Sequence, residues 1–299
     1  MSEFWSTWVV VLVIVTLGIT VFLFLWGLRV DIPTRPDGTS GHVWAHGVLR
    51  EAVRRLPTWW IVFSAAWLIA GLGYLALYPG LGAFAGALGW TSGGELALSQ
   101  DANRRLAAPL LERVRGKPVE TIVADPAALR VGGVLFIDNC AVCHGRDARG
   151  NRALGAPDLT NNAWRYGGDG KSILTSILDG RTGTMPPFGG SMSDSEIRDL
   201  ANYVLSLSGR THDSLRAQFG KPRFSGCAAC HGPEGKGNPA LGAPDLTDNV
   251  WLYGGGIEDI VETLRRGRNG VMPAFRTRLG EENASLVAAW VYAQSRPAR

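Results

Sequence analysis

The feature that most constrains the fold of this chain is an internal repeat with a constant offset of 87 residues. The octapeptide Ala-Leu-Gly-Ala-Pro-Asp-Leu-Thr at 153–160 recurs unchanged at 240–247. Between about 140 and 190, adding 87 to a position gives its counterpart without a gap. Self-similarity at a fixed offset indicates duplicated structural units, and 299 residues leave room for two or three domains at about 100 to 200 residues each. The repeat predicts two copies of one small domain, over 126–210 and 211–299.

All four cysteines belong to one motif that occurs once in each copy. The two motifs read Cys140-Ala-Val-Cys143-His144 and Cys227-Ala-Ala-Cys230-His231. Cys-x-x-Cys-His is an attachment signal for c-type haem. A four-cysteine zinc site needs pairs about 15 to 20 residues apart, whereas these pairs are 84 apart (227 minus 143). A thioredoxin-like dithiol explains neither the histidine nor the duplication. The motifs therefore predict two covalently bound haem c groups, with His144 and His231 as proximal iron ligands.

Each copy also supplies a candidate for the sixth iron ligand. The chain has four methionines, and two of them, Met185 and Met272, stand 41 residues after the motif histidines (185 minus 144 and 272 minus 231). Both precede proline, in Met185-Pro-Pro-Phe and Met272-Pro-Ala-Phe. Equal placement in both copies favours axial ligation over core filling, and His/Met ligation raises the reduction potential of a haem. The spacing leaves open which methionine ligates which iron.

Further residues are expected to support the haems. Pro157 and Pro244 fall where a carbonyl could accept the Nδ1 proton of the ligand histidine and orient its ring. Trp164, Tyr166, Trp251 and Tyr253 could pack a haem edge or donate to a propionate, or simply fill the core. Amphipathic patterns at 194–205 and 281–294 predict helices. Residues 127–139 predict another helix, whose Gly132 and Gly133 permit a close helix crossing.

Two apolar stretches near the N-terminus predict membrane-spanning helices over about 8–28 and 59–78. Phe4 to Leu28 contains no charged residue, and about 20 apolar residues span a bilayer as a helix. A cleaved signal peptide is disfavoured, because Glu3 stands where basic residues are usual and Arg29-Val-Asp31 stands where small cleavage-site residues are usual. Residues 81–90 are too rich in glycine to extend the second helix and are expected to form an apolar loop at the membrane interface.

The charge distribution predicts the topology of this membrane anchor, residues 1–90. The segment 29–58 between the helices holds five arginines, whereas only an acid precedes the first helix. The positive-inside rule puts this segment in the cytoplasm, so the chain after residue 90, with a linker over 91–125, is expected in the periplasm. Bacteria attach haem c on that side. His42 and His46 of the cytoplasmic segment are expected to be ordinary loop histidines, and no basic stripe for nucleic acid is present.

The whole chain resembles one family of dihaem subunits. Besides the haem motifs and the Met-Pro-x-Phe loops, the resemblance is carried by Gly38-Thr-Ser-Gly-His42-Val-Trp44, Leu56-Pro-Thr-Trp-Trp60, Tyr78-Pro79-Gly80 and Leu88-Gly-Trp90. With these motifs the chain is similar to the dihaem P subunits of cbb3-type cytochrome c oxidases. The resemblance implies an all-α fold, in which a two-helix transmembrane hairpin in the bacterial inner membrane precedes two tandem class I cytochrome c domains.

The same resemblance implies the role and the partners of the chain. Electrons would enter from a soluble or membrane-bound cytochrome c, or from a quinol–cytochrome c reductase. They would pass through the two haems to a monohaem cytochrome c subunit and to the catalytic haem-copper subunit of a proton-pumping oxidase. The chain itself would not be an enzyme, because both irons have six ligands. The resemblance also implies a second arrangement, in which the methionines are exchanged between the domains, so that Met272 would serve the first haem and Met185 the second.

Two other functions are compatible with the motifs. A dihaem peroxidase or oxidase would need one iron with an open or displaceable site, which two equivalent methionine loops disfavour. A membrane-anchored dihaem cytochrome c that serves another periplasmic redox enzyme would have the same haem ligands. Its partners would distinguish it from an oxidase subunit.

Overall fold

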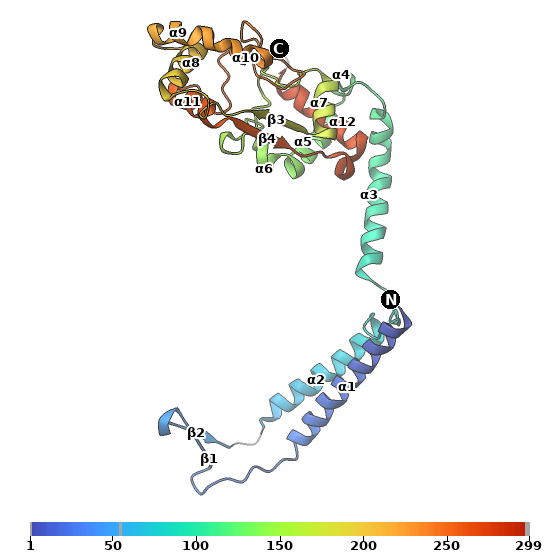
Figure 1. The fold of residues 1–299 in the computed structure, drawn as a ribbon. Coiled ribbons are helices and arrows are strands. Elements are labelled where there is room, and N and C mark those ends of the chain that lie inside the picture. The colour runs from blue at the N-terminus through green and yellow to red at the C-terminus, as the bar shows by residue number, and fades with distance from the viewer. Residues whose placement is uncertain (1, 54–55, 297–299) are drawn as a thin grey trace. The chain divides into compact units, whose positions relative to one another are not determined.

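The computed structural model of the protein describes residues 2–53 and 56–296. The chain divides into two compact units, one that ends at Arg105 and one that begins at Leu106. Helices predominate in both units (Figure 1). Each unit is described by itself below.

The first unit contains two long apolar helices, α1 (Glu3–Gly27) and α2 (Thr58–Leu77). Their most apolar 18-residue windows have mean hydropathies of 2.9 and 1.9, and none of the residues in these windows is buried. Apolar side chains that cover a helix on all sides require an apolar surrounding, so both helices have the length and composition needed to cross a membrane. The predicted span 59–78 agrees with α2 to within one residue, whereas α1 begins five residues before the predicted span 8–28.

A small hairpin lies between these helices. Strands β1 (Thr39–Trp44) and β2 (Leu49–Ala52) pair antiparallel around the 3-10 turn η1 (Ala45–Gly47). Glu51 joins the strands, because its carboxylate accepts hydrogen bonds from Ser40 Oγ at 2.9 Å and from Trp44 Nε1 at 2.8 Å. His42 stacks on Trp44, with ring centroids 4.4 Å apart. No cluster of three or more potential metal ligands occurs among the described residues.

The segment after α2 is irregular where the glycine content predicted a loop. Residues 78–91 form turns and bends. Ala83 N donates a 2.7 Å hydrogen bond to Ser6 Oγ, so the loop is fastened to the start of α1. A Cβ added to Gly82 would lie only 2.6 Å from Ser6 O, so this contact requires glycine. Two helices then occupy most of the predicted linker 91–125, α3 (Ser92–Val114) and α4 (Val119–Ile122).

The second unit holds both sequence repeats, and the two repeats contribute similar successions of elements, which differ in the place of the 3-10 helix. The first repeat contains α5 (Pro126–Asn139), α6 (Ala141–His144), η2 (Arg152–Leu154), α7 (Gly170–Asp179), β3 (Arg181–Met185) and α8 (Asp194–Leu207). The second repeat contains α9 (Ser214–Gly220), η3 (Lys221–Phe224), α10 (Ser225–His231), α11 (Ile257–Arg266), β4 (Arg268–Met272) and α12 (Arg276–Gln294).

The two hydrophobic cores of this unit each draw on both repeats. In the first core, α5 and α7 of the first repeat pack against α12, the last helix of the second repeat. In the second core, α8 of the first repeat packs against α9 and α11 of the second. Figure 1 shows α12 beside α5 and α7, and α8 beside α9 and α11. The repeats have thus exchanged their C-terminal helices.

The glycines of α5 permit the closest of these helix contacts. A Cβ added to Gly132 would lie 2.2 Å from Leu286 O, and one added to Gly133 would lie 2.9 Å from Trp290 Nε1. The crossing predicted from these glycines therefore exists, and its partner is α12. The second core has the corresponding contact, since a Cβ on Gly220 of α9 would lie 2.2 Å from Asp199 O of α8.

Strands β3 and β4 join the repeats as a two-stranded antiparallel ribbon. The central pair is Gly183 with Gly270, and these positions are themselves equivalent in the repeat (183 plus 87). The register thus places a pseudo-two-fold axis between these glycines. The fold is mostly helical, but the prediction that it is all-α is wrong for this ribbon and for the β1–β2 hairpin. The strands of the ribbon are five residues each, and each pairs with a partner 87 residues away, so no local pattern marked them.

Candidate haem sites

The two motif histidines have the same environment. His144 ends α6 and His231 ends α10, and each is only 8% exposed. Nδ1 of His144 lies 3.1 Å from the carbonyl oxygen of Pro157, and Nδ1 of His231 lies 3.1 Å from that of Pro244. A carbonyl only accepts hydrogen bonds, so Nδ1 carries the proton and Nε2 is left unprotonated, as a metal ligand must be. Burial lowers the pKa of both histidines, which favours this neutral form.

The cysteines of each motif differ in exposure. Cys140 and Cys227 are buried, Cys143 and Cys230 are exposed, and all four are free thiols. Burial raises the pKa of Cys140 to about 11 and also raises that of Cys227. Each motif lies in one or two helical turns directly before its histidine. The two thiols of a motif therefore lie close to the imidazole ring of the histidine that would ligate the iron.

Each repeat has, among the residues that the structure describes, one buried polar side-chain atom without a hydrogen-bond partner, and these atoms indicate whether the surroundings of the motifs fit a haem. Nε1 of Trp164 and Nε1 of Trp251 are buried and have no hydrogen-bond partner in the described parts of the chain. An unpartnered buried N–H costs about 1–3 kcal/mol, and here the same cost recurs at equivalent positions (164 plus 87). At each tryptophan, a bound anionic group such as a haem propionate would accept the hydrogen bond that Nε1–H can donate. The residues present therefore fit a haem at each motif.

The methionine loops are anchored to the opposite repeat. Phe275 N, three residues after Met272, donates to Ile177 O of α7 at 3.0 Å. Phe188 N, three residues after Met185, donates to Leu264 O of α11 at 2.8 Å. Met272 packs against the core that contains Cys140, and Met185 packs against the core that contains Cys227. The structure thus brings Met272 together with the first motif and Met185 with the second.

Two arginines also lie near the methionines, and their place beside these residues was not predicted from the sequence. Arg181 pairs with Met272 across the β3–β4 ribbon, and Arg268 pairs with Met185. The guanidinium of Arg181 lies over the ring of Tyr166 at 4.8 Å, and that of Arg268 lies over Tyr253 at 4.3 Å. The available signal was the recurrence of both arginines at the repeat offset (181 plus 87).

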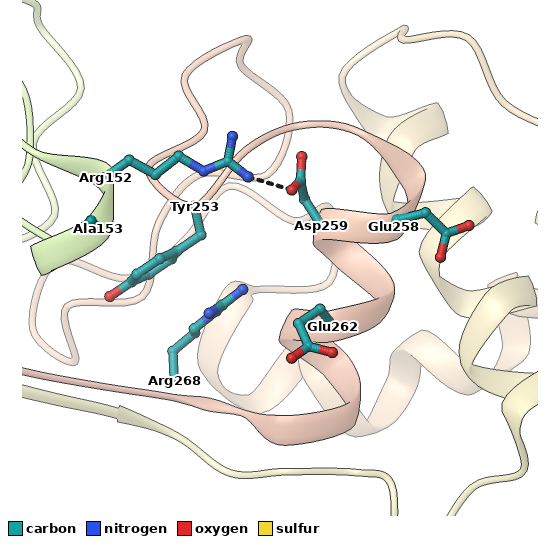
Figure 2. A pocket seen from close by; sticks show the side chains of 7 residues that line it. All are labelled: Arg152, Ala153, Tyr253, Glu258, Asp259, Glu262 and Arg268. Atoms are coloured by element: carbon teal, nitrogen blue, oxygen red, sulfur yellow. Dashed lines mark hydrogen bonds and ion pairs between the residues drawn. The ribbon is translucent and has the colours of Figure 1, made fainter.

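Figure 2 shows the surroundings of one of these pairs, at an open depression of about 600 Å³. Arg152 of the first repeat forms an ion pair there with Asp259 of the second. Tyr253 and Arg268 line the same depression, and Glu262 lies beside them. The position equivalent to Arg152 is Pro239 (152 plus 87). This ion pair is therefore one of the features in which the two repeats differ.

Comparison with known proteins agrees with this picture. The family described as "Cytochrome C oxidase, cbb3-type, subunit III" matches residues 127–204 and 216–291. The family described as "N-terminal domain of cytochrome oxidase-cbb3, FixP" matches residues 37–85. The first family thus matches each of the two repeats, and the second matches the hairpin, α2 and the start of the loop that follows it.

Relatives align along most of the chain. The cbb3-type cytochrome c oxidase subunit CcoP of Rubrivivax gelatinosus is 39% identical, over 99% of this chain and 97% of the relative. The subunit FixP of Azorhizobium caulinodans is 36% identical, over 85% of this chain and 92% of the relative. That of Sinorhizobium medicae is 34% identical, over 85% and 93%. With a repeated haem motif, a methionine loop packed at each motif and two apolar N-terminal helices, the chain belongs to the family of cbb3-type cytochrome c oxidase subunit III proteins.

Proposed function

We propose that this chain is the electron-transfer subunit of a cbb3-type cytochrome c oxidase and carries two haem c groups. Cys140 and Cys143 would hold the first haem, and Cys227 and Cys230 the second. The observation that carries the proposal recurs at both motifs: a buried histidine has its Nδ1 3.1 Å from a proline carbonyl oxygen, and a methionine packs against the core that contains the first cysteine of the motif.

The packing supports an exchanged pairing of the axial ligands. His144 would share its iron with Met272, and His231 would share its iron with Met185. Support comes from the core contacts of the two methionines and from the anchoring of each loop to the opposite repeat. The interval of 41 residues between histidine and methionine within each repeat would then result from the duplication and not from ligation of the same iron.

The residues around each site favour electron transfer over catalysis. A bound c-type haem supplies a one-electron iron couple, whose potential His/Met ligation raises. His144 and His231 are fixed through Nδ1, and the methionine loops are held by backbone hydrogen bonds. With a histidine and a methionine as its two protein ligands, each iron would keep no position for oxygen. The isolated chain would therefore not be an enzyme, and oxygen would be reduced in another subunit.

The family and the charge distribution support a proposal for the location and the partners of the chain. We place α1 and α2 in the bacterial inner membrane as a hairpin, with the β1–β2 segment in the cytoplasm and the haem domains, 126–210 and 211–299, in the periplasm. Arg54 and Arg55, which support this topology, lie outside the described residues. The partners would be the haem-copper subunit, a monohaem cytochrome c subunit and a cytochrome c or quinol–cytochrome c reductase as donor.

Haem content and spin state test the proposal. The purified full chain should contain two covalent haems, both low-spin, and should not reduce oxygen by itself. One haem per chain, or a high-spin haem with turnover, would contradict it. Recovery with haem-copper subunits from a membrane extract is expected. Recovery with a different periplasmic redox enzyme would favour the other function named above.

Single-haem variants test the exchanged pairing. In a chain with Cys140→Ala and Cys143→Ala, only the haem of His231 remains. Adding Met185→Ala should abolish the sulfur–iron charge-transfer band, whereas adding Met272→Ala should preserve it. The mirror variants, built on Cys227→Ala and Cys230→Ala, should show the reverse. Loss of the band with the methionine of the same repeat would instead establish ligation within each repeat.

A further inference from the structure

The inner face of the β3–β4 ribbon has a charged residue beside each methionine. Residues that pair directly across an antiparallel ribbon point to the same face, with Cβ atoms about 4.5–5.5 Å apart. Arg181 pairs in this way with Met272, and Met185 pairs with Arg268. These four side chains are half-buried, whereas the intervening Thr182 and Thr184 are exposed. Each candidate sulfur ligand thus has an arginine of the other repeat as its cross-strand neighbour.

Both guanidinium groups are held in the same manner. Arg181 Nε donates to Ser176 Oγ at 2.8 Å, and Arg268 Nε donates to Thr263 Oγ1 at 2.9 Å. Ser176 and Thr263 are equivalent positions (176 plus 87). Cation–π contacts with Tyr166 and Tyr253 hold the other side of the groups, as described above. We call the hydroxyl group and the tyrosine ring that hold each arginine its clamp: Ser176 and Tyr166 for Arg181, and Thr263 and Tyr253 for Arg268. Both clamps consist of neutral groups, and their recurrence in the two repeats indicates a requirement that both sites share.

The charge of these arginines is not neutralised by an ion pair. In the described parts of the chain, no carboxylate oxygen lies within 4.0 Å of either guanidinium, whereas other arginines of this unit have such partners, for example Arg276 with Asp179. Glu262, which lines the depression beside Arg268, pairs with Arg266 instead (Figure 2). A half-buried cation is screened less by solvent than an exposed one. Each ribbon end therefore carries a fixed positive charge.

The clamps also assign each arginine to one site. Ser176 lies in α7, which belongs to the core of Cys140 and Met272. Thr263 lies in α11, which belongs to the core of Cys227 and Met185. Cross-strand pairing and clamp agree for both arginines. Arg181 thus belongs to the site of His144, and Arg268 to the site of His231.

We propose that Arg181 and Arg268 set the reduction potentials of the two haems, each through its fixed charge at one site. The inference rests on the proposed function, since it requires a haem at each motif. An oxidised iron carries one positive charge more than a reduced iron. A fixed cation nearby therefore destabilises the oxidised form and raises the potential.

Redox titration of the full dihaem chain tests this role. Arg181→Gln should lower the midpoint potential of one haem, Arg268→Gln that of the other, and the double variant both. We expect an approximately tenfold change in the equilibrium constant of the affected haem, which is about 59 mV for a one-electron couple. Arg181→Lys and Arg268→Lys, which retain the charge, should keep a higher midpoint than the corresponding glutamine variants. Equal midpoints for the lysine and glutamine variants would overturn the proposal.

One control variant separates charge from structure. Arg276→Gln removes an exposed cation that is already paired with Asp179 and Glu281, and it should leave both midpoints unchanged. Failure of the proposed function would appear separately, as a wild-type chain without two low-spin, methionine-ligated haems.

Discussion

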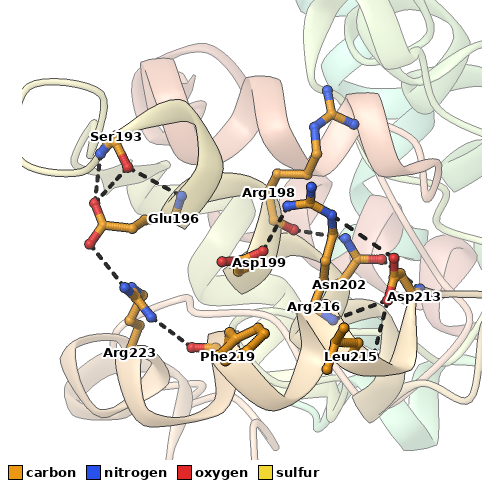
Figure 3. A network of polar contacts seen from close by, with 10 residues as sticks. All are labelled: Ser193, Glu196, Arg198, Asp199, Asn202, Asp213, Leu215, Arg216, Phe219 and Arg223. Atoms are coloured by element: carbon orange, nitrogen blue, oxygen red, sulfur yellow. Dashed lines mark hydrogen bonds and ion pairs between the residues drawn. The ribbon is translucent and has the colours of Figure 1, made fainter.

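At the scale of single residues, Glu196 ties together the start of α8 and the segment before the second haem motif (Figure 3). Its carboxylate accepts hydrogen bonds from Ser193 N at 2.9 Å and from Arg223 at 3.0 Å, and Glu196 N donates back to Ser193 Oγ. This is a capping box, which satisfies two backbone donors at the helix start. The backbone hydrogen bond from Ser193, with smaller contributions from Arg223 and the Ser193 hydroxyl, lowers the pKa of Glu196 to about 2.

The lowered pKa predicts a specific pH dependence. A carboxyl group whose pKa is depressed by folding stabilises the protein above its unfolded pKa, and this contribution is lost as the pH falls towards the folded value. We therefore expect Glu196→Gln to lower the urea midpoint at pH 7, and the difference from the wild type to shrink between about pH 5 and pH 2. Circular dichroism at several pH values would measure it. A difference from the wild type that stays constant down to about pH 2 would contradict this role of Glu196.

At the scale of elements, the crossing of α5 and α12 depends on the absence of a side chain at Gly132. The atom nearest to an added Cβ would be a backbone oxygen, Leu286 O at 2.2 Å. At the adjacent Gly133 the nearest atom would be the ring edge of Trp290, at 2.9 Å. A backbone atom cannot move without shifting its helix, whereas a side chain can rotate. The two glycines therefore differ in how much the crossing depends on them.

This difference predicts the order of two substitutions. Alanine favours a helix interior over glycine by about 1 kcal/mol, and both variants gain this term. Gly132→Ala should nevertheless destabilise the protein by about 1–3 kcal/mol, because overpacking forces the helices apart. Gly133→Ala should be milder. Urea unfolding of both variants would check the order, and equal stabilities would show that the helices do not cross so closely.

At the scale of the whole second unit, each hydrophobic core is built from helices of both repeats, so the units that stabilise the fold are the exchanged cores and not the repeats. Leu286 of the second repeat and Leu200 of the first are fully buried. Leu286 lies in the core of Cys140, and Leu200 lies in the core of Cys227. From the sequence repeats alone, Leu286 would be assigned to the second haem motif and Leu200 to the first.

The exchange predicts crossed effects of two matched substitutions. Truncation of a buried leucine to alanine costs about 2–5 kcal/mol. Leu286→Ala should speed amide hydrogen exchange in α5 and α7 of the first repeat, and Leu200→Ala should speed it in α9 and α11 of the second. Hydrogen exchange resolved by peptide mass spectrometry would separate these segments. Faster exchange confined to the repeat that carries the substitution would contradict the exchanged arrangement.

The sequence by itself determined the family, the electron-transfer role and the two apolar helices, because each depends on local residue patterns. It also marked the eight candidate haem-binding and ligand residues, whose constant offset needs no tertiary information. The proline carbonyls at His144 and His231 were predictable for the same reason. The β1–β2 hairpin and the β3–β4 ribbon were not predicted, because short strands are specified mainly by their partners.

Only the tertiary structure decided which half of each repeat packs with which. Two copies of one domain offer nearly equivalent surfaces, so packing within a repeat and packing between repeats satisfy the same sequence pattern. The ribbon between Gly183 and Gly270 shows the exchange. Its strands are antiparallel, so each strand leads to a methionine that packs in the core of the other repeat's haem motif. The same register places Arg181 opposite Met272 and Arg268 opposite Met185. Residues that lie 91 positions apart (272 minus 181) and 83 positions apart (268 minus 185) thereby become neighbours through contacts that no local pattern encodes.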